Sequence, residues 1–328
     1  MKLLGLTCGR KMGCSEILLK EALMGAEELG IDVEILRLLD LDVKPCRLCK
    51  TCLWQQKGPE KCVIKDDAPF LWNKVMECDG LIISAPVYTL TPPGYLKMIG
   101  DRALGPKGDV AFKLELKKEQ GTDVRFGSPA SIDERAFKPR AGAFISVGGA
   151  PYPDWVSLGL PLLHTMTFSL QIAIVDQMQV LRVGNILGAV VLYEETIKRA
   201  RQLGRNVAEG MGKPFDEVKY RGDKPGTCPV CHTNLMLVGK TSTVECAICG
   251  IHGKIKVDGD KITVVFPEEE QKKSRLTIEG KRIHFYEILD VAQELEPRLS
   301  EITPKLEKYK SYKSYIKPPS KVGKKSGA

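Results

Sequence analysis

The stretch Lys2-Leu-Leu-Gly-Leu-Thr-Cys-Gly-Arg-Lys-Met-Gly-Cys-Ser15 contains a predicted strand, a loop and the start of a helix. Its residues 2–7 form a short apolar run, which suits a buried parallel strand. A glycine-containing loop follows, and Ser15 is then expected to cap a helix over about residues 16–29 that stops at Gly30. A buried strand that leads directly into a helix is typical of a β-α-β unit, so this stretch predicts an α/β fold.

The alternation of strands and helices continues beyond this first unit. Further strands are expected at residues 33–36, 80–84, 141–147 and 171–177, and further helices at residues 68–77, 93–104, 154–168 and 193–211. Strands that alternate with helices form a parallel sheet covered on both faces. The five strands therefore predict a flavodoxin-like, doubly wound five-stranded parallel sheet.

Changes in composition divide the chain into three predicted parts. A polar segment at residues 106–140 interrupts the first part and is expected to be an insertion or a lid. The second part contains a predicted β-hairpin from residues 255–257 and 262–266, and the third a predicted helix near residues 285–299. The parts are a flavodoxin-like domain (1–212) with a cysteine-rich insertion (44–65), a small β domain (213–266), and a C-terminal helix with a basic tail (267–328).

Composition indicates a water-soluble globular protein. Hydrophobic residues make up 43% of the 328 residues and charged residues 27%. No stretch approaches the roughly 18–20 apolar residues that span a membrane, and the first apolar run is too short for a signal peptide. We therefore expect a cytoplasmic protein without a membrane partner. Much of the net charge of +8 lies in residues 304–328, which carry eight lysines against one glutamate; we expect a solvated, disordered tail there.

The first predicted strand leads into a candidate phosphate site. Free backbone N–H groups and the helix dipole at a helix N-terminus favour a phosphate, and ligands of doubly wound sheets bind beyond the carboxyl ends of the strands. Hydroxyl groups and basic side chains in the loop would add donors and positive charge. An ordinary strand–helix turn is the alternative interpretation of this loop alone. The candidate residues are Thr7, Gly9, Arg10, Lys11, Gly13, Cys14 and Ser15.

Two further strand ends carry a resemblance. Ser84-Ala-Pro-Val-Tyr88 and Ser146-Val-Gly-Gly-Ala150 resemble the corresponding loops of the NADPH-dependent FMN reductase and iron–sulfur flavoprotein family. The resemblance implies that FMN binds here, with one loop along the isoalloxazine ring and the glycines allowing close backbone approach. The residues that it implies as flavin contacts are Pro86, Val87, Tyr88, Thr89, Gly148, Gly149 and Ala150.

Four cysteines in the insertion form a first candidate metal site. Cys46, Cys49 and Cys52 have C-x2-C-x2-C spacing, and Cys62 follows after nine residues. One compact loop can wrap three thiolates around a cluster while a more distant cysteine closes it, which favours a [4Fe–4S] cluster. Zinc, which more often uses two separated pairs, is the alternative. Iron–sulfur flavoproteins carry a similar motif between the second and third strands.

A second group of cysteines lies in the small β domain. Cys228, Cys231, Cys246 and Cys249 have C-x2-C-x14-C-x2-C spacing, a strong four-thiolate signal. A domain of about 50 residues has too little core to fold well unaided, so a structural metal is expected. The spacing predicts a zinc-ribbon-like domain that binds Zn²⁺, with rubredoxin-like iron as the alternative.

Together these sites predict an oxidoreductase that relays electrons between a [4Fe–4S] cluster and FMN. A cluster transfers one electron at a time and a flavin one or two. The resemblance implies a homo-oligomer, a dimer or tetramer, in which one subunit's cluster lies near another's flavin. A ferredoxin-like carrier or a larger redox complex is a possible partner, and the alternatives are an electron-wiring subunit and a redox-responsive nucleic-acid-binding protein. No catalytic acid or base is identified, and the electron donor, the acceptor and the use of NAD(P)H stay open.

Overall fold

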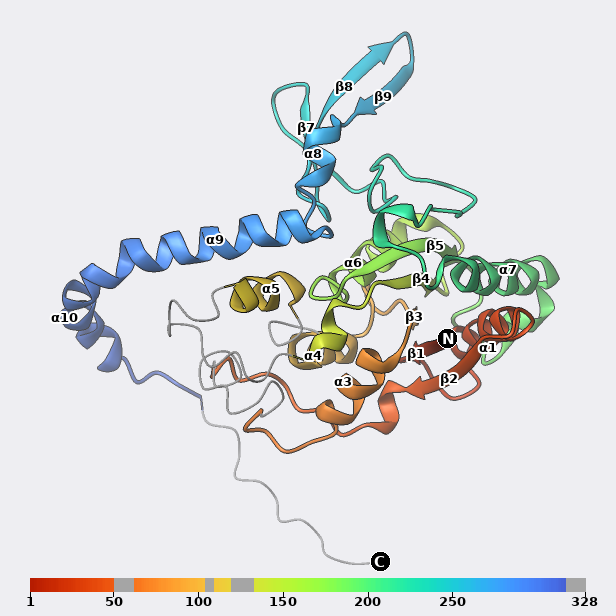
Figure 1. Ribbon diagram of the computed structural model, residues 1–328, viewed down its shortest axis with the longest axis horizontal. Helices are drawn as coiled ribbons and strands as arrows, with labels where there is room; N and C mark the ends of the chain where they lie inside the picture. The colour runs from red at the N-terminus through yellow and green to blue at the C-terminus, as the bar shows by residue number, and fades with distance from the viewer. Residues whose placement is uncertain (50–61, 104–108, 119–132, 317–328) are drawn as a thin grey trace, which may run out of the picture. The chain divides into compact units, whose positions relative to one another are not determined.

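The computed structural model describes residues 1–49, 62–103, 109–118 and 133–316 (Figure 1). The chain divides into two compact units, Met1–Ile283 and His284–Ala328. The first unit contains both β-sheets and both groups of cysteines. The domain boundaries expected at residues 212 and 266 stay a prediction.

The larger sheet has five parallel strands in the order β2-β1-β3-β4-β5. This order is the flavodoxin-like, doubly wound topology that the sequence predicts. Buried residues fill β1, β3 and β4 almost completely, as both faces of the sheet are covered. The strands are β1 (Lys2–Thr7), β2 (Asp32–Arg37), β3 (Gly80–Pro86), β4 (Arg140–Val147) and β5 (Ile172–Val180).

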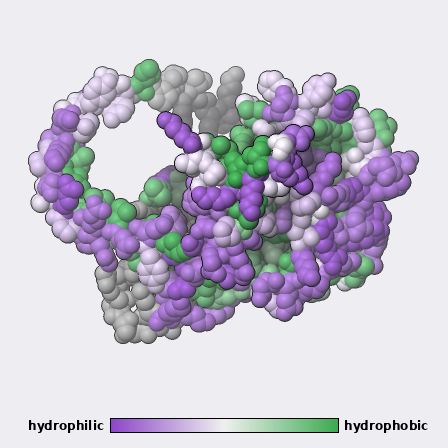
Figure 2. Space-filling view, turned by 90° about the horizontal axis from the view of Figure 1, so that it is seen from above, coloured by the Kyte–Doolittle hydropathy of each residue, from purple (hydrophilic) through white to green (hydrophobic). Residues whose placement is uncertain are grey.

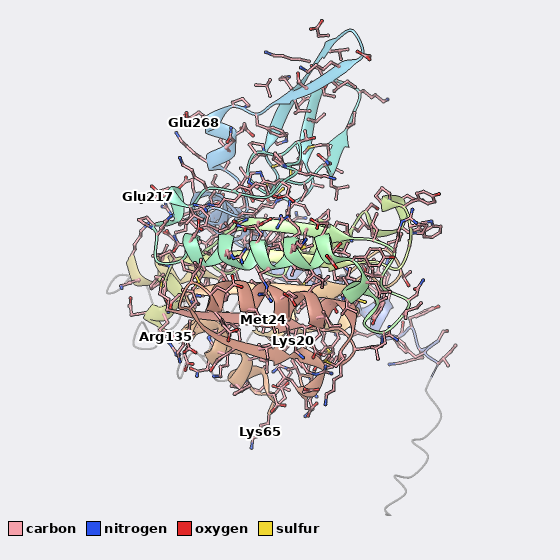
Figure 3. The ribbon with its side chains drawn as sticks, turned by 90° about the vertical axis from the view of Figure 1, so that its right-hand side faces the viewer. Lys20, Met24, Lys65, Arg135, Glu217 and Glu268 are labelled. Atoms are coloured by element: carbon pink, nitrogen blue, oxygen red, sulfur yellow. The ribbon has the colours of Figure 1, made fainter. Side chains whose placement is uncertain are left out.

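Helices cover each face of this sheet over a separate hydrophobic core. One core joins the sheet to α1 (Cys14–Glu27) and α7 (Glu194–Gly210). Figure 3 shows α1, which carries the labelled Lys20 and Met24, lying beside α7. The opposite core joins the sheet to α3, α4 and α6. These three helices are α3 (Ala68–Glu77), α4 (Gly94–Ala103) and α6 (Gly159–Thr165).

Two glycines bring α1 and α7 into close contact. A Cβ atom on Gly204 would lie 1.6 Å from the carbonyl oxygen of Ala22, and one on Gly25 would lie 2.1 Å from that of Arg201. Both neighbouring atoms belong to the backbone and cannot turn aside. These positions therefore need glycine, although glycine inside a helix costs roughly 1 kcal/mol relative to alanine.

Several predicted bounds are corrected. The N-cap of α1 is Gly13, so Ser15 lies inside the first turn and does not cap the helix. The helix expected at 154–168 is two pieces, the 3-10 turn η6 (Pro153–Val156) and α6. A Cβ on Gly159 would lie 2.3 Å from the Ser146 hydroxyl, so α6 begins in close contact with β4. The segment at 106–140 contains α5 (Val110–Lys118), which the sequence pattern did not predict.

The smaller sheet is antiparallel, in the order β6-β7-β8-β9, and contains the predicted hairpin. Figure 2, seen from above, shows a hydrophobic patch near the middle of the visible face. Exposed aliphatic side chains of the small sheet are Leu237, Val238, Val257, Ile262 and Val265. Its strands are β6 (Met236–Val238), β7 (Thr243–Cys246), β8 (His252–Asp258) and β9 (Lys261–Val265), followed by α8 (Glu268–Lys272).

The helix expected at residues 285–299 begins earlier and is interrupted. Helix α9 spans Ile278–Leu295, a 3-10 turn containing Pro297 follows, and α10 spans Leu299–Lys310. Proline lacks a backbone N–H group and clashes with the preceding turn, which accounts for the break. None of the described helices combines the length and hydropathy that crossing a membrane requires.

Candidate functional site

A pocket of about 320 Å³ lies at the carboxyl ends of the parallel strands. The loops that follow β1, β3 and β5 meet there with Val147, the last residue of β4, because parallel strands end at the same edge of the sheet. The residues that line the pocket are Gly9, Arg10, Gly13, Cys14, Ser15, Pro86, Tyr88, Val147, Gly184 and Asn185.

The N-terminus of α1 forms one end of the pocket. The first intrahelical bond runs from the Ile17 N–H to the Gly13 carbonyl, 3.0 Å, so the amides of Cys14 and Ser15 have no partner earlier in the helix. A Cβ on Gly9 would lie only 2.1 Å from the Ser15 hydroxyl oxygen. A larger residue than glycine at this position would therefore displace the hydroxyl. Amides, a hydroxyl and the helix dipole together fit a phosphate group.

Charges around this end favour an anion. Arg10 lines the pocket and donates from Nη2 to the Gly184 carbonyl, 3.3 Å. The buried Glu16 carboxylate is paired with Lys20, 2.7 Å, and with Arg37. Burial alone would raise the pKa of Glu16. The hydrogen bonds and charges of Lys20 and Arg37 lower it by a larger amount, so the net shift of the pKa is downward. The carboxylate next to the pocket is thus ionised and neutralised by its two partners.

The loop after β3 is a tight turn with two left-handed residues. The Tyr88 N–H donates to the Thr91 carbonyl, 2.8 Å, and the Thr91 N–H donates back, 3.3 Å. Between them Thr89 and Leu90 have φ values of 50° and 73°. Such conformations cost on the order of 1 kcal/mol each for residues with a side chain, and they are frequent at functional sites. The turn fixes Tyr88 at the rim of the pocket.

The loops after β4 and β5 are joined by hydrogen bonds. The Gly148 N–H donates to the Val180 carbonyl, 2.8 Å, and the Gly184 N–H donates to the Gly148 carbonyl, 3.2 Å. A Cβ on Gly149 would lie 2.3 Å from the Asn185 side-chain oxygen, so Asn185 packs directly over this glycine. Gly184 and Asn185 were missed from the sequence, although they follow the fifth parallel strand, as the other pocket loops follow theirs.

The structure gathers part of the predicted flavin set into the pocket. Seven predicted residues line it, and the other seven lie in the same three loops without lining it. Thr7 is buried, with its hydroxyl accepting from the Gly9 N–H at 3.4 Å. The residues outside the lining are Thr7, Lys11, Val87, Thr89, Gly148, Gly149 and Ala150.

The cysteines of the insertion stand at the protein surface. Cys46 and Cys49 are exposed and Cys62 is half-buried, while Cys52 lies outside the described residues. The Cys46 sulfur accepts a hydrogen bond from the Leu48 N–H, 3.4 Å. Among the described residues, these thiols do not form a group with three ligand atoms close enough for one ion.

The two ends of the insertion nevertheless lie together. The Lys44 N–H donates to the Asp66 carboxylate, 2.9 Å, and the Lys44 ammonium group donates to the Lys65 carbonyl, 3.1 Å. The segment that carries Cys46 and Cys62 therefore begins and ends at the same place in the fold. The first and last ligands of a compact cluster must lie close together in this way. Cysteine thiols are the ligand type that a [4Fe–4S] cluster takes, so the residue types of this group fit such a cluster.

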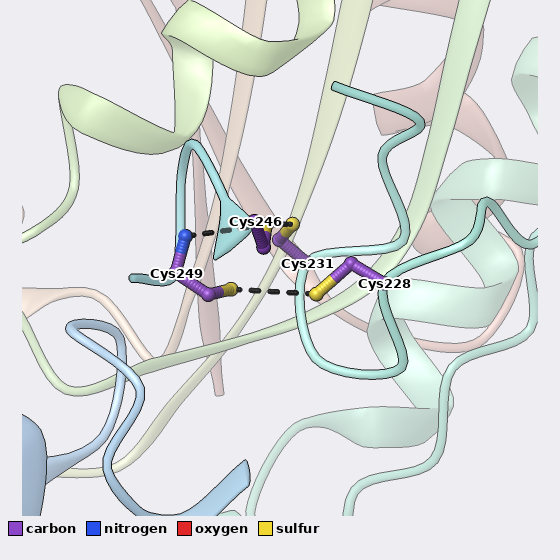
Figure 4. A group of neighbouring side chains, drawn as sticks. All are labelled: Cys228, Cys231, Cys246 and Cys249. Carbon is purple, nitrogen blue, oxygen red and sulfur yellow. Dashed lines mark hydrogen bonds between the residues drawn. The ribbon is translucent and has the colours of Figure 1, made fainter. Parts of the chain in front are cut away.

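The second group of cysteines forms a preorganised metal site. The Sγ atoms of Cys228, Cys231, Cys246 and Cys249 all lie within 4.8 Å of one another, and all four residues are buried. Two sulfur–sulfur distances are 3.7 Å and 3.5 Å. A tetrahedral zinc site with Zn–S bonds of roughly 2.3 Å requires about 3.8 Å between sulfurs. Figure 4 shows the four side chains turned toward one another, and the other three cysteines lower the pKa of Cys246, which favours a thiolate there.

The two Cys-x-x-Cys turns share a backbone feature. The residue after the second cysteine of each pair is left-handed, with φ of 55° at His232 and 72° at Gly250. The Cys249 N–H donates to the Cys246 sulfur, 3.4 Å, as amides do around metal-bound thiolates. The four side chains and their backbone thus fit a structural zinc ion or a rubredoxin-like iron ion.

A buried hydrogen-bond chain ties this metal site to the large sheet. Gln177, on β5, donates from Nε2 to the His232 carbonyl, 2.7 Å, and to the Cys231 carbonyl, 3.4 Å. Its Oε1 atom lies 3.0 Å from His164 Nε2, which must then be the donor. Burial lowers the pKa of His164 to about 4, so this ring is neutral near neutral pH.

Comparison with known proteins places this fold and site in a family. Residues 1–153 match the NADPH-dependent FMN reductase family. A flavone synthase from Aspergillus candidus is 32% identical over 332 residues, which cover 99% of this chain and 100% of that protein. The chain belongs to the NADPH-dependent FMN reductase family.

Two other similar proteins sharpen the comparison. The solved structure of a flavone reductase is 26% identical, covers 97% of this chain and 100% of its own, and superimposes with a TM-score of 0.78. An iron–sulfur flavoprotein from Methanocaldococcus jannaschii is 36% identical over 129 residues, 39% of this chain and 63% of that protein. This chain is therefore an FMN-dependent oxidoreductase with iron–sulfur flavoprotein homologues.

Proposed function

We propose that the chain binds FMN in the strand-end pocket and exchanges two electrons with a conjugated ketone of the flavone class. The phosphate would be held by the amides of Cys14 and Ser15, the Ser15 hydroxyl and Arg10. The ring would lie between Tyr88 and the glycines of the loop after β4. The observation that carries the proposal is the likeness to a flavone synthase over the whole chain, with a pocket at the carboxyl ends of four parallel strands.

The surroundings of the pocket suit a flat, largely apolar substrate. Tyr152 and Trp155, in and after the loop that follows β4, are 64% and 63% exposed, and Tyr88 is 53% exposed. Aromatic faces exposed next to a redox site offer stacking surfaces to a planar molecule. Bound FMN supplies hydride chemistry that suits the C2=C3 bond of a flavone. Reduction would add a hydride at C2 and a proton at C3, and flavone formation would run in reverse.

The second part of the proposal is that a [4Fe–4S] cluster on Cys46, Cys49, Cys52 and Cys62 relays electrons to or from the flavin. The likeness to iron–sulfur flavoproteins and the joined ends of the insertion support it. The exposed position of Cys46 and Cys49 suits electron entry from a separate carrier such as a ferredoxin-like protein. The four buried cysteines would hold zinc in a structural role.

Association into a homo-oligomer also belongs to the proposal. The loop after β5, which contributes Gly184 and Asn185 to the pocket, continues into exposed apolar residues. Ile186 is 70% exposed, Leu187 55% and Leu192 80%. Contiguous apolar surface of this kind is typical of protein–protein contacts. Light scattering after gel filtration would test it, and a monomer at micromolar concentration would contradict it.

Anaerobic reoxidation tests the proposed function. The purified flavoprotein is reduced under anaerobic conditions and mixed with a flavone, and the return of oxidised flavin absorbance is followed. We expect the flavone to reoxidise the flavin in a single turnover. The product should be heavier than the added flavone by two hydrogen atoms. The Trp155→Ala variant should lower the apparent affinity for the flavone, whereas Tyr309→Ala, which removes another exposed aromatic side chain, serves as the control. Reoxidation by a ferredoxin-type acceptor but not by a flavone would instead favour an electron-wiring subunit.

A further inference from the structure

One buried guanidinium group joins the two ends of the cysteine-rich insertion. Arg102 lies in the last turn of α4, and its side chain is only 2% exposed. Its Nη1 atom donates to the Lys44 carbonyl, 2.5 Å, and to the Asp66 carboxylate, 2.6 Å. Its Nη2 atom donates to the other Asp66 oxygen, 3.0 Å. Residue 44 precedes the first cysteine of the motif and residue 66 follows the last, so one side chain contacts both ends.

The carboxylate partner is also fully used. The Asp66 carboxylate is shielded from solvent and accepts from the Lys44 N–H, 2.9 Å, and the Ala68 N–H, 3.2 Å, besides its two bonds from Arg102. Burial alone would raise the pKa of Asp66. These hydrogen bonds and the Arg102 charge lower it by a larger amount, so the carboxylate is ionised. The pair is thus a bidentate, charge-assisted contact with fixed geometry.

The guanidinium lies where the segment that carries the predicted cluster ligands begins and ends, through its bonds to Lys44 and Asp66. A contact that only closed a loop would not need a charge, because apolar residues of similar volume often replace a buried ion pair without loss of stability. Positive charge and N–H donors beside cluster thiolates, by contrast, stabilise the ligands and influence the reduction potential.

Helix α4 links this group to the flavin site. The helix begins at Gly94, shortly after the turn that holds Tyr88, and it ends beside Arg102. It is fixed along its length, since Leu96 and Ile99 are buried in the core and the Tyr95 hydroxyl donates to the Leu41 carbonyl, 2.5 Å. One packed helix therefore connects the chain just after the Tyr88 turn with the anchor of the cysteine segment.

We propose that Arg102 is the positioning residue of the iron–sulfur cluster: it closes the cysteine segment, supplies positive charge where that segment begins and ends, and fixes the cluster relative to the flavin through α4. This inference rests on the proposed cluster. It assigns Arg102 no contact with substrate or flavin. Asp66 orients the guanidinium and prevents it from turning away from the segment.

The test compares Arg102→Met with a matched control on the same helix. Lys97→Met also removes a positive charge from an ion pair, but Lys97 and Asp101 are 61% and 50% exposed. Iron, acid-labile sulfide and FMN are measured per chain after anaerobic purification, with the cluster midpoint potential and the rate of iron loss to a chelator. We expect about tenfold faster iron loss and a lower potential in Arg102→Met, unchanged values in Lys97→Met, and full FMN in both.

Two further variants separate positioning from simple bracing. Arg102→Lys keeps the charge but loses the planar fork, so it should keep the potential and still lose iron faster than the wild type. The double variant Arg102→Met with Asp66→Leu removes both charges; if the pair only braces the fold, this variant should regain normal iron retention and potential. Full recovery there, or normal iron and potential in a folded Arg102→Met, overturns the inference.

The proposed cluster can fail separately. Wild-type protein with FMN but no iron would contradict the cluster itself, and the role of Arg102 with it. If Arg102→Met does not fold, as judged by its thermal melt, the Arg102→Lys protein decides. Iron loss at the wild-type rate in that variant contradicts the role of the fork.

Discussion

The two groups of cysteines have the same ligand chemistry but opposite surroundings. Cys228, Cys231, Cys246 and Cys249 are buried together, with all four sulfurs within 4.8 Å of one another. In the insertion, Cys46 and Cys49 are exposed, and the described thiols do not converge on one ion. A buried, closed site is typical of a structural metal, whereas an exposed one gives electrons access. The surroundings of the thiols, more than their number, thus favour the proposed structural metal in the buried group and the proposed redox cluster in the exposed one.

The anchors of the two groups differ in the same direction. Gln177 holds the buried site through hydrogen bonds from its uncharged amide to the backbone carbonyls of Cys231 and His232. Arg102 and Asp66 hold the insertion through a buried charge pair. A neutral anchor stabilises a fold without changing charge, and a charged anchor also acts on the electrostatics of what it holds. The following experiments test this contrast, beginning with the largest expected effect.

Removing one buried thiolate should abolish the closed site. We expect Cys246→Ser to lose most of its bound zinc and the hydrogen-exchange protection of β7 and β8, because a metal contributes much of the stability of so small a domain. FMN content should stay normal. Zinc analysis and hydrogen exchange measure the result. Cys78→Ala, which removes a buried thiol outside both groups, is the control, and full zinc in Cys246→Ser would refute the assignment.

Acid should weaken the region that anchors the buried site. The His164 ring is fully buried, and burial lowers its pKa from 6.5 to about 4. The unfolded chain binds this proton more readily than the folded chain, so stability is complete above pH 6.5 and falls toward pH 4. The expected loss is about 3 kcal/mol.

Denaturant unfolding at several pH values measures this effect. The difference between wild type and His164→Phe isolates the contribution of this ring from that of the metal thiolates. The exposed His284→Phe variant should keep the wild-type pH dependence. An identical pH dependence in His164→Phe and wild type would contradict the neutral buried state of His164.

Loss of the neutral anchor should have a smaller effect. Gln177→Leu leaves the Cys231 and His232 carbonyls without their amide donor, which costs about 1–3 kcal/mol. Zinc transfer to a chelator should become roughly tenfold faster, with iron content unchanged. Gln202→Leu, on α7, serves as the control. Simultaneous loss of iron would show that the two sites are not independent.

The smallest expected effect concerns the phosphate end of the flavin pocket. Gly9→Ala should displace the Ser15 hydroxyl and weaken FMN binding by about 1 kcal/mol, the usual value of one hydrogen bond. FMN fluorescence titration measures it. Gly94→Ala is the matched control, because a Cβ there meets no atom within 4 Å. Equal affinity in both variants would argue against a phosphate at this position.

Much of the fold could be predicted because the central strands are continuous apolar runs. Residues 80–84 are such a run, and the structure places β3 at Gly80–Pro86. The four-thiolate site was predictable from its spacing, which local turn geometry fixes. The loops at Tyr88 and Gly149 could be located because they directly follow predicted strands.

The rest depended on contacts between distant residues. β5 continues to Val180 although Asp176, Gln177 and Gln179 are polar, because each finds a partner elsewhere in the fold. Arg199 donates to the Asp176 carboxylate, 2.9 Å, and Gln179 donates to the Ser146 carbonyl, 3.0 Å. Ending the predicted strand at Gln177 hid the loop with Gly184 and Asn185. Nor could the sequence reveal that Arg102 pairs with Asp66, 36 residues earlier.

Metal analysis of paired variants tests the contrast between the two groups most directly. Anaerobically purified wild type, Cys46→Ser and Cys246→Ser are assayed for iron, zinc and FMN per chain. We predict about four irons, one zinc and one FMN in the wild type. Cys46→Ser should lose iron and keep zinc, and Cys246→Ser should lose zinc and keep iron, with FMN in both. Wild type without iron, or loss of both metals in either variant, would contradict the division into a redox site and a structural site.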